Sequence, residues 1–433
     1  MRADHRRLPL FSRVADQAQN ALSSSWENVM TSDDCRFCCT NAGPTPQGAS
    51  RRVFLLGAAA AAGGLLAAPH RAAAAEPGEA VPLFAYIGCF TSERRKAHAK
   101  GISVYRIDAN GSWSLVQTLE TLPNPQFITF DQRQKFLYSV HGDGTEVSSY
   151  AIDKASGRIS FLNKQPTSGN NSTHLTPDPT NRYIVIGNGI GVAVFPINSD
   201  GSLAPYSDMV PAGGDVGPHR NQVGPGPHPH FVGFDPSGRF LLAPDRGTDR
   251  THIYRLDLAS GKLLPNNPAF AGSRPGAGPR HLAFHPAKPW AYVCDELDST
   301  VTAYAWDSAR GELKPFQVIT TLPEDYVGGN TTAEIQFAPS GHYLYVSNRG
   351  HNSIVIFSVD QASGKLSPIG WEATRGRTPR FFGLDPTGHL LYAANLDSDN
   401  IVVFMVDTAT GKLTPTGQVV ETGSPSCIIF ARA

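Results

Sequence analysis

Short runs of alternating apolar and polar residues recur along this chain at intervals of about forty residues. Residues 343–347, 354–359 and 365–369 are three such runs, and the connections between the runs are rich in Gly, Asp and Ser. Alternation with a period of two predicts β-strands that bury one face. Four such strands, repeated at this spacing, are typical of a β-propeller, in which each repeat forms one blade.

Six copies of this repeat are complete. Their inner strands are expected to begin near Gln126, Thr173, His230, Arg280, Ala333 and Arg380. Before the first copy, residues 84–89, 101–107 and 113–119 supply three strands without an inner strand, and residues 426–430 supply an inner strand alone. Because these pieces complete one another, we predict an all-β fold: a seven-bladed propeller whose first blade is closed by the C-terminal strand.

Composition supports this architecture and argues against a nucleic-acid partner. The 433 residues include 42 Gly and 34 Pro, as a fold with many tight turns requires. Charged residues make up 17% of the chain and the formal net charge is zero. A nucleic-acid-binding domain would show a basic patch or run, which the repeat region lacks, so we expect no nucleic-acid partner.

The N-terminal segment has the pattern of an export signal. Arg51 and Arg52 precede an apolar stretch rich in Ala and Gly, and small residues at 72–75 follow it. The apolar stretch of roughly 16 residues is shorter than the ~20 that a membrane span needs. We therefore predict that residues 1–75 are an n-region plus twin-arginine signal, removed on export by the twin-arginine machinery. Residues 76–433 would form one propeller in the periplasm or outside the cell, with no stable membrane anchor. Both Met1 and Met30 remain open as the start.

The cysteines predict no metal centre. Cys35, Cys38 and Cys39 lie before the signal and lack a fourth ligand nearby. The closure scheme places Cys89 and Cys427 on neighbouring strands of the first blade. A disulfide is permitted in an exported protein, and two buried thiols are the alternative.

Charged and imidazole side chains recur where the inner strands begin and where the second strands end, two places on the same face of a four-stranded blade. The residues concerned are His141, His230, Asp245, Arg246, Arg280, His281, Glu296, Glu334, Asn348, Arg349 and Arg380. We predict that they converge on one central funnel; the alternative is a rim of unrelated, solvated charges. We assign Asp245, Arg246, His281, Glu334 and Arg380 to substrate binding.

The residue types in this set limit the chemistry. The chain from residue 76 onwards contains no Gly-x-Ser-x-Gly elbow, no His-Glu-x-x-His motif and no Gly-rich loop leading into a helix. Arginines bind anions and stabilise an oxyanion, and His or Glu can move a proton. This inventory favours hydrolysis or isomerisation of a small anionic or polyhydroxylated ester, without a cofactor.

The same residues resemble the lactonase family of seven-bladed propellers, which includes propeller-type 6-phosphogluconolactonases and carboxy-cis,cis-muconate cyclases. The resemblance runs from about residue 83 to the C-terminus, and its most specific pieces are residues 276–286 and 291–301. It implies that His230, Arg280, Glu296 and Arg349 are catalytic. In one departure, Arg246 stands where such proteins more often have Leu.

Three functions remain open at this point. The first is an exported hydrolase of a sugar-type or carboxylated lactone, since a phosphorylated sugar lactone is scarce outside the cytoplasm. The second is a binding or scaffold propeller without catalysis, and the third is a muconate-type cycloisomerase that closes a lactone ring. The sequence favours an enzyme over a scaffold, and it does not separate hydrolysis from cyclisation.

Overall fold

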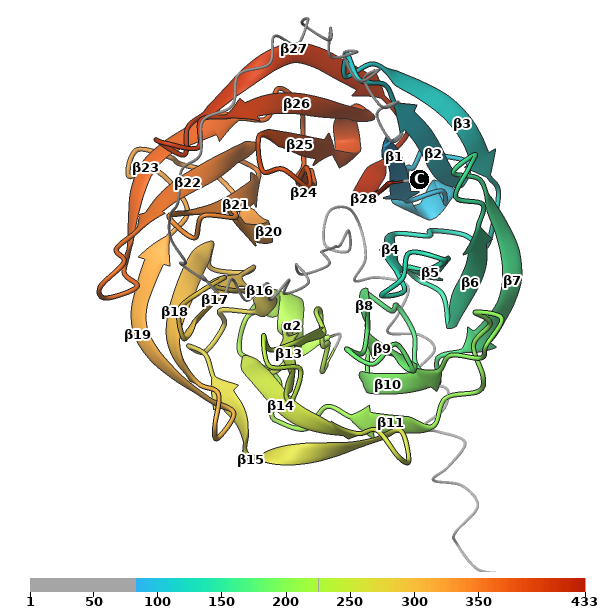
Figure 1. Ribbon diagram of the computed structural model, residues 1–433. Helices are drawn as coiled ribbons and strands as arrows, with labels where there is room; N and C mark the ends of the chain where they lie inside the picture. Colours follow the sequence, from blue (N-terminus) through green and yellow to red (C-terminus); the bar gives the residue numbers. More distant parts are fainter. Residues whose placement is uncertain (1–82, 225, 433) are drawn as a thin grey trace, which may run out of the picture. The chain divides into compact units, whose positions relative to one another are not determined.

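The computed structural model describes residues 83–224 and 226–432, and in this part of the chain seven four-stranded antiparallel sheets surround a central axis (Figure 1). The predicted signal at residues 1–75 and the predicted mature start at residue 76 lie outside the described residues. No helix in the described ranges has the length and apolar character to cross a membrane.

The strands follow one another from the inside of each blade to the outside, and we number the blades in chain order. Blade 1 contains β28 (Pro425–Arg432), β1 (Leu83–Cys89), β2 (Ile102–Ile107) and β3 (Trp113–Leu119), and blade 2 contains β4 (Phe127–Phe130), β5 (Phe136–Val140), β6 (Glu146–Ile152) and β7 (Ile159–Pro166). Blade 3 contains β8 (His174–Pro177), β9 (Tyr183–Asn188), β10 (Gly191–Pro196) and β11 (Asp208–Pro211), and blade 4 contains β12 (Gly233–Phe234), β13 (Leu241–Asp245), β14 (Arg250–Asp257) and β15 (Lys262–Gly272). Blade 5 contains β16 (Pro279–Phe284), β17 (Trp290–Asp295), β18 (Thr300–Asp307) and β19 (Glu312–Thr320). Blade 6 contains β20 (Thr331–Phe337), β21 (Tyr343–Arg349), β22 (Ser353–Val359) and β23 (Leu366–Ala373), and blade 7 contains β24 (Pro379–Leu384), β25 (Leu390–Asn395), β26 (Asn400–Val406) and β27 (Leu413–Glu421).

The first blade is closed by the C-terminal strand, which confirms the predicted closure. Strand β28 pairs with β1 in antiparallel register from Leu83 opposite Arg432 to Gly88 opposite Cys427. The pairing hides the inner edge of β1, which would otherwise present unpaired backbone groups. Blade 1 is therefore assembled from the two ends of the described chain.

Neighbouring blades are joined by buried tyrosines as well as by apolar packing. Tyrosine hydroxyls on the second strands donate to glycine carbonyls in the outer turn of the next blade, at 2.7–3.1 Å: Tyr86 to Gly157, Tyr138 to Gly201, Tyr292 to Gly364 and Tyr345 to Gly411. Gly364 has φ 74°, and a Cβ added there would lie 2.6 Å from the ring of Trp290. The glycine of the repeated Asp-x-x-(Ser/Thr)-Gly-Lys turn thus allows both the left-handed backbone and the close approach of two blades.

Cys89, Cys294 and Cys427 are buried free thiols, which decides between the two alternatives for the first blade. The thiol of Cys89 donates to the carbonyl of Gly101 at 3.0 Å. Burial raises the pKa of Cys89 to about 12, so it is a packing residue and not a nucleophile.

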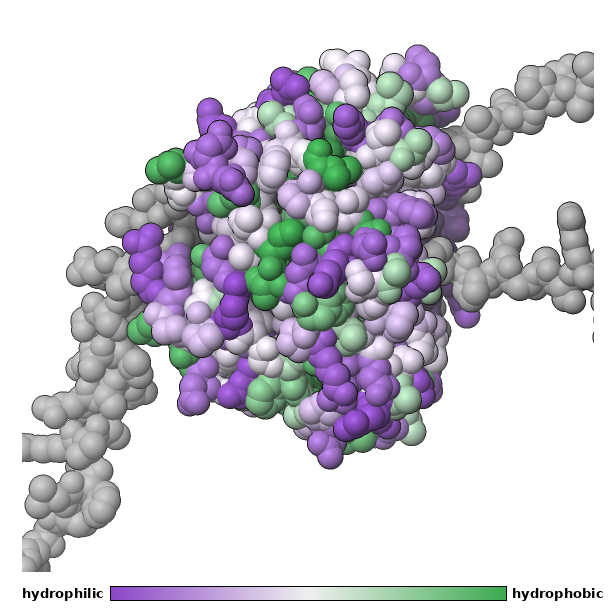
Figure 2. Space-filling model, turned by 90° about the vertical axis from the view of Figure 1, so that its left-hand side faces the viewer, coloured by the Kyte–Doolittle hydropathy of each residue, from purple (hydrophilic) through white to green (hydrophobic). Residues whose placement is uncertain are grey.

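The outer side of the ring is mixed in polarity. Seen from the side, polar residues cover most of the surface, and apolar residues are scattered among them (Figure 2). Val318 on β19 and Ile369 on β23 are among the exposed apolar side chains. Isolated apolar residues of this kind are normal on a protein surface.

Candidate functional site

The inner strands enter the funnel through a repeated β-bulge. In blade 5, Pro279 lies opposite Asp295 and His281 opposite Cys294, which leaves Arg280 as the extra residue. Arg380 in blade 7 and Ser426 in blade 1 occupy the same position in their strands. A bulge redirects side chains at the start of a strand, so two consecutive residues of one strand can serve the same site.

The strand register defines two layers of seven residues around the axis. The first layer contains Gln126, Thr173, His230, Arg280, Ala333, Arg380 and Ser426, and the second contains Phe127, His174, Phe231, His281, Glu334, Phe381 and Cys427. In blade 4 the ladder proper begins only at Gly233, later than the predicted start at His230. Pro229 has no N–H for the ladder, and the N–H of His230 donates to the carbonyl of Pro244 at 2.8 Å, which holds the segment in place.

Polar side chains at or next to the ends of the second strands are engaged with the scaffold. Amide nitrogens of Asn188, Asn348 and Asn395 donate to threonine carbonyls of the preceding connection at 2.8–3.2 Å. Asp245, predicted to bind substrate, instead accepts from the N–H groups of His228 and Gly247, at 2.7 and 2.8 Å. These contacts hold the Asp245 carboxylate against the backbone, and its charge acts on the imidazole of His228. His141 is likewise engaged, with Ser148 at 2.9 Å.

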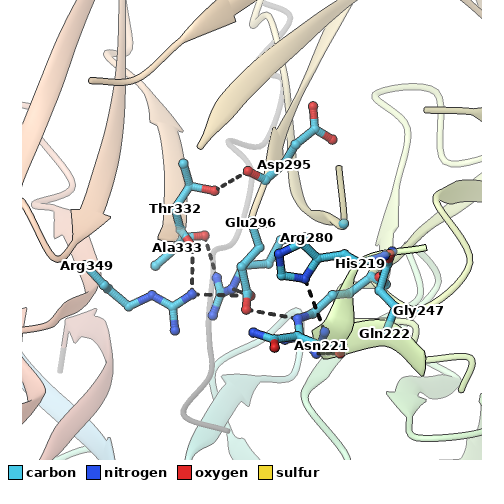
Figure 3. Close-up of polar contacts among 12 residues, drawn as sticks. His219, Asn221, Gln222, Gly247, Arg280, Asp295, Glu296, Thr332, Ala333 and Arg349 are labelled. Carbon is cyan, nitrogen blue, oxygen red and sulfur yellow. Dashed lines mark hydrogen bonds and ion pairs between the residues drawn. The ribbon is translucent and has the colours of Figure 1, made fainter. Parts of the chain in front are cut away.

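The residue that follows Asp245, Asp295 or Asn348 reaches the funnel in blades 4, 5 and 6. The Glu296 carboxylate is contacted by three guanidinium groups. Its Oε1 accepts from Nε of Arg246 at 2.9 Å. Its Oε2 accepts from Nε of Arg280 at 2.9 Å, and a terminal nitrogen of Arg349 lies 3.3 Å from Oε2 (Figure 3). Arg280 and Arg349 also donate to the carbonyls of Ala333 and Thr332, the latter at 2.8 Å. These contacts fix the arginines before any ligand arrives.

The charge state of Glu296 follows from this arrangement. Burial raises the pKa of Glu296, but the guanidinium groups of Arg246, Arg349 and Arg280 outweigh burial and hold it below its ordinary value. The carboxylate therefore stays ionised at neutral pH and is a weak proton acceptor. The geometry makes Glu296 an anchor for the arginines.

Four histidines line the other side of the cluster. The ring of His230 lies 5.6 Å from that of His228 and 5.5 Å from that of His281, and His174 lies 5.6 Å from His281. Burial, followed by the charge of Arg280, lowers the pKa of His230 and of His281 well below its ordinary value. Burial also lowers the pKa of His228 to about 4. These three imidazoles are therefore neutral at physiological pH.

Glu334 and Arg380 are also buried at the axis. Nδ1 of His281 lies 3.3 Å from Oε2 of Glu334. The guanidinium of Arg380 lies 5.3 Å from the ring centre of Phe90, and its charge acts on His230, His281 and Glu296. Within residues 83–224 and 226–432, no three His, Cys, Asp or Glu side chains are grouped so that they could hold a metal ion.

One contribution to the rim was missed by the sequence reasoning. The long connection between β11 and β12 contains α2 (Arg220–Val223), which stands near the axis (Figure 1). The carbonyl of Asn221 accepts from Arg246 at 3.4 Å, and Nε2 of Gln222 donates to the carbonyl of Arg246 and to Asp249, at 2.8 and 2.7 Å. In the sequence, this connection is longer than the same connection in the other repeats, and that length could have indicated an added element at the rim.

Comparison with known proteins agrees with the fold. The family model described as "Lactonase, 7-bladed beta-propeller" matches residues 84–430. The chain is 36% identical to a 6-phosphogluconolactonase of Bacillus subtilis over 307 residues, which cover 69% of this chain and 84% of that protein. A solved structure of a periplasmic gluconolactonase of Pseudomonas aeruginosa superposes with a TM-score of 0.74 and 32% identity, and covers 81% of this chain and 99% of its own. A putative 6-phosphogluconolactonase of Bacteroides fragilis superposes with a TM-score of 0.75 and 32% identity, covering 82% and 99%.

Proposed function

Because this chain belongs to the lactonase family of seven-bladed β-propellers, we propose that it is an exported enzyme that hydrolyses a small lactone in its central funnel. The lactone is of the sugar type or carries a carboxylate. The observation that carries this proposal is the contact of three guanidinium groups with one carboxylate, beside neutral imidazoles.

The charge of the cluster favours an electron-rich substrate. Four arginines, Arg246, Arg280, Arg349 and Arg380, face two carboxylates, Glu296 and Glu334, which leaves an excess of two positive charges (4 − 2) when the histidines are neutral. Lactone hydrolysis develops negative charge on the carbonyl oxygen, and fixed cations stabilise such an oxyanion. A carboxylate or several hydroxyl groups on the lactone ring would accept hydrogen bonds from the arginines of the cluster.

The proposed reaction uses water and one base. The oxygen of water adds to the carbonyl carbon of the lactone while its proton passes to His230, and an arginine stabilises the oxyanion. Collapse of this intermediate breaks the bond between the carbonyl carbon and the ring oxygen, which takes the proton back from His230. The product is the hydroxy acid, and the enzyme is unchanged.

The substrate class is argued from the exported position that the sequence predicts. The relative in Pseudomonas aeruginosa is named a periplasmic gluconolactonase, which supports an unphosphorylated sugar lactone for an exported enzyme. The relatives in Bacillus subtilis and Bacteroides fragilis are named for the phosphorylated lactone. A sugar lactone with and without phosphate is therefore the central comparison of the assay.

The test is acid release by the purified protein on a panel of lactones. We expect turnover above the spontaneous rate, fastest on an unphosphorylated aldonolactone or a carboxylated lactone. The Glu296→Gln variant, purified in parallel, controls for contaminating esterases. Absence of turnover on every lactone would favour the scaffold function, and ring closure of a muconate-type diacid would favour the cycloisomerase.

Export is tested separately. Replacement of Arg51 and Arg52 by Lys should leave the precursor inside the cell, whereas the parent chain should be found outside the cytoplasm and begin near Glu76. Normal export of the double variant would contradict the twin-arginine signal without affecting the proposed reaction.

A further inference from the structure

We propose that Glu334 and His281 form a carboxylate–imidazole pair that positions His230 and stabilises the charge that His230 gains when it takes the proton of water. The inference rests on the proposed function, because it assigns the parts of that reaction. Glu334 and His281 act through His230 and are positioning residues, while His230 contacts the reacting atoms.

The second layer around the axis shows why this pair is unusual. On one side of this layer the aromatic rings pack against one another. The ring centres are 3.9 Å apart for Phe127 and His174, 4.3 Å for His174 and Phe231, and 5.3 Å for Phe231 and His281. Phe381 and Cys427 hold the corresponding positions in blades 7 and 1. Four of the seven described residues of this layer are therefore Phe or Cys, two are His, and Glu334 is the one carboxylate.

A carboxylate at such a position is costly unless it is paired. Glu334 is 0% exposed and its Oε2 lies 3.3 Å from Nδ1 of His281, which is also 0% exposed. The backbone fixes the acid: Oε1 accepts from the N–H of Ile335 at 3.1 Å, and the N–H of Glu334 donates to the hydroxyl of Ser347 at 3.0 Å. The Glu334 carboxylate is therefore held beside one ring nitrogen of His281.

The imidazole of His281 connects the acid to the first layer. Its ring lies 5.5 Å from that of His230 at an angle of 50°. Charged and titratable groups face His281 from several elements: Glu334 on β20, His174 on β8, Arg280 on β16, Arg349 on β21, Arg380 on β24 and His230 before β12. Three of these groups are arginines, and Glu334 is the one carboxylate among them.

The need for this charge arises during the reaction. When His230 takes a proton from water, it becomes an imidazolium beside Arg280 and Arg380, whose charges oppose it. Glu296 is already engaged by three guanidinium groups. The Glu334–His281 pair offsets the new positive charge on His230. The proton then passes from His230 to the ring oxygen of the lactone, so the pair itself neither gains nor loses a proton.

The experiment compares Glu334→Gln, Glu334→Asp, His281→Gln and the double variant Glu334→Gln/His281→Gln in the full chain. Glu372→Gln is the matched control, because Glu372 lies in the same blade and makes an exposed pair with Arg375. kcat and KM are measured across pH on the best lactone found for the parent, and thermal melting reports the folded fraction.

We expect Glu334→Gln and His281→Gln each to lower kcat by ~10–10²-fold with KM changed less than about threefold. Loss of the negative charge lowers the pKa of His230 further, so the acidic limb of kcat/KM should move to lower pH in Glu334→Gln. Glu334→Asp should recover part of kcat, and the double variant should be about as slow as the single ones.

Three outcomes overturn the inference. An active parent whose variants keep kcat and the position of the acidic limb would show that the pair is uninvolved. A fall in kcat that follows the folded fraction, with an unmoved limb, would show that the pair only supports packing. A parent inactive on every lactone overturns the proposed function and this inference with it, so the two failures are distinguishable.

Discussion

The two halves of the ring differ at one position of the repeat, which lies at the end of the second strand or within two residues beyond it. In blades 4, 5 and 6 this residue is Arg246, Glu296 or Arg349, whereas in blades 1, 2, 3 and 7 it is Phe90, Gly142, Gly189 or Leu396. The strand-end side chain just before it makes scaffold contacts in both halves, as Asn188 and Asn348 do. The half-rings thus share one architecture and differ in a position that the architecture leaves open. The charged cluster of this repeat protein is therefore built from departures from the repeat.

The largest effect is expected from removal of the closing strand β28, on which both halves of the ring depend. Deletion of residues 426–433 removes most of β28 and exposes the edge of β1, so the ring loses its closure. We expect insoluble protein or a large loss of thermal stability, measured as soluble yield and melting temperature. Parental melting would mean that the ring closes through some other pairing.

The second prediction separates the halves. Glu296→Gln leaves Arg246, Arg280 and Arg349 without their shared carboxylate, and Arg280→Ala removes a cation from the site. We expect each to lower lactone turnover by at least ~10²-fold while the protein remains folded. Glu146→Gln is the control in the other half, where the exposed pair of Glu146 with Lys164 should contribute little.

If both site variants keep parental turnover while the protein is folded, the funnel is a binding site and the difference between the halves is not catalytic. If Glu146→Gln loses turnover to the same extent, the effect of charge removal is general and the comparison fails.

The third prediction concerns the strand-end position and has the smallest effect. Burial raises the pKa of Asp295 to about 7, although the hydroxyls of Thr302 and Thr300 donate to its carboxylate. An acid with a pKa raised by folding stabilises the native state below the unfolded pKa of ~4, and this stabilisation is lost as pH rises toward about 7. The Asp295→Asn variant has no acid to ionise at this position, so it should not lose this stabilisation as pH rises. We expect its melting temperature to exceed that of the parent by a few degrees at pH 8 and to be similar at pH 4.

The converse variant tests the same position in the other half. Asn395→Asp loses the amide that donates to the carbonyl of Thr374 at 3.0 Å, so it should melt below the parent at neutral pH. Equal melting of both variants and the parent across pH would show that the strand-end residue does not distinguish Asp from Asn.

The repeat spacing predicted the blades, their order and the closing strand, because each strand has its own alternation and its own turn residues. It also brought Arg280, Glu296, Arg349 and Arg246 to one face, and the structure joins them through ion pairs. The catalytic roles of Arg280, Glu296, Arg349 and His230 stay a prediction, as do the substrate-binding roles of Arg246 and Arg380.

Other features could not be read from the chain because they depend on register. A bulge lets Arg280 and His281, adjacent in sequence, both face the axis, which simple alternation does not anticipate. Asp245 and Arg246 are equally adjacent, and only the turn geometry decides that the first bonds the backbone and the second reaches Glu296. The contact between Arg246 and Asn221 requires knowing how the β11–β12 connection folds.

The pairing of β28 with β1 also determines when the ring can close during synthesis of the chain. Among the described strands, β1 leaves the ribosome first and β28 last, and at 5–20 residues per second the interval between them is on the order of tens of seconds. During that interval β1 has an unpaired inner edge, and blade 1 cannot form however far the other blades have progressed. A nascent or prematurely terminated chain therefore stays an open ring, and only a full-length product can shut it.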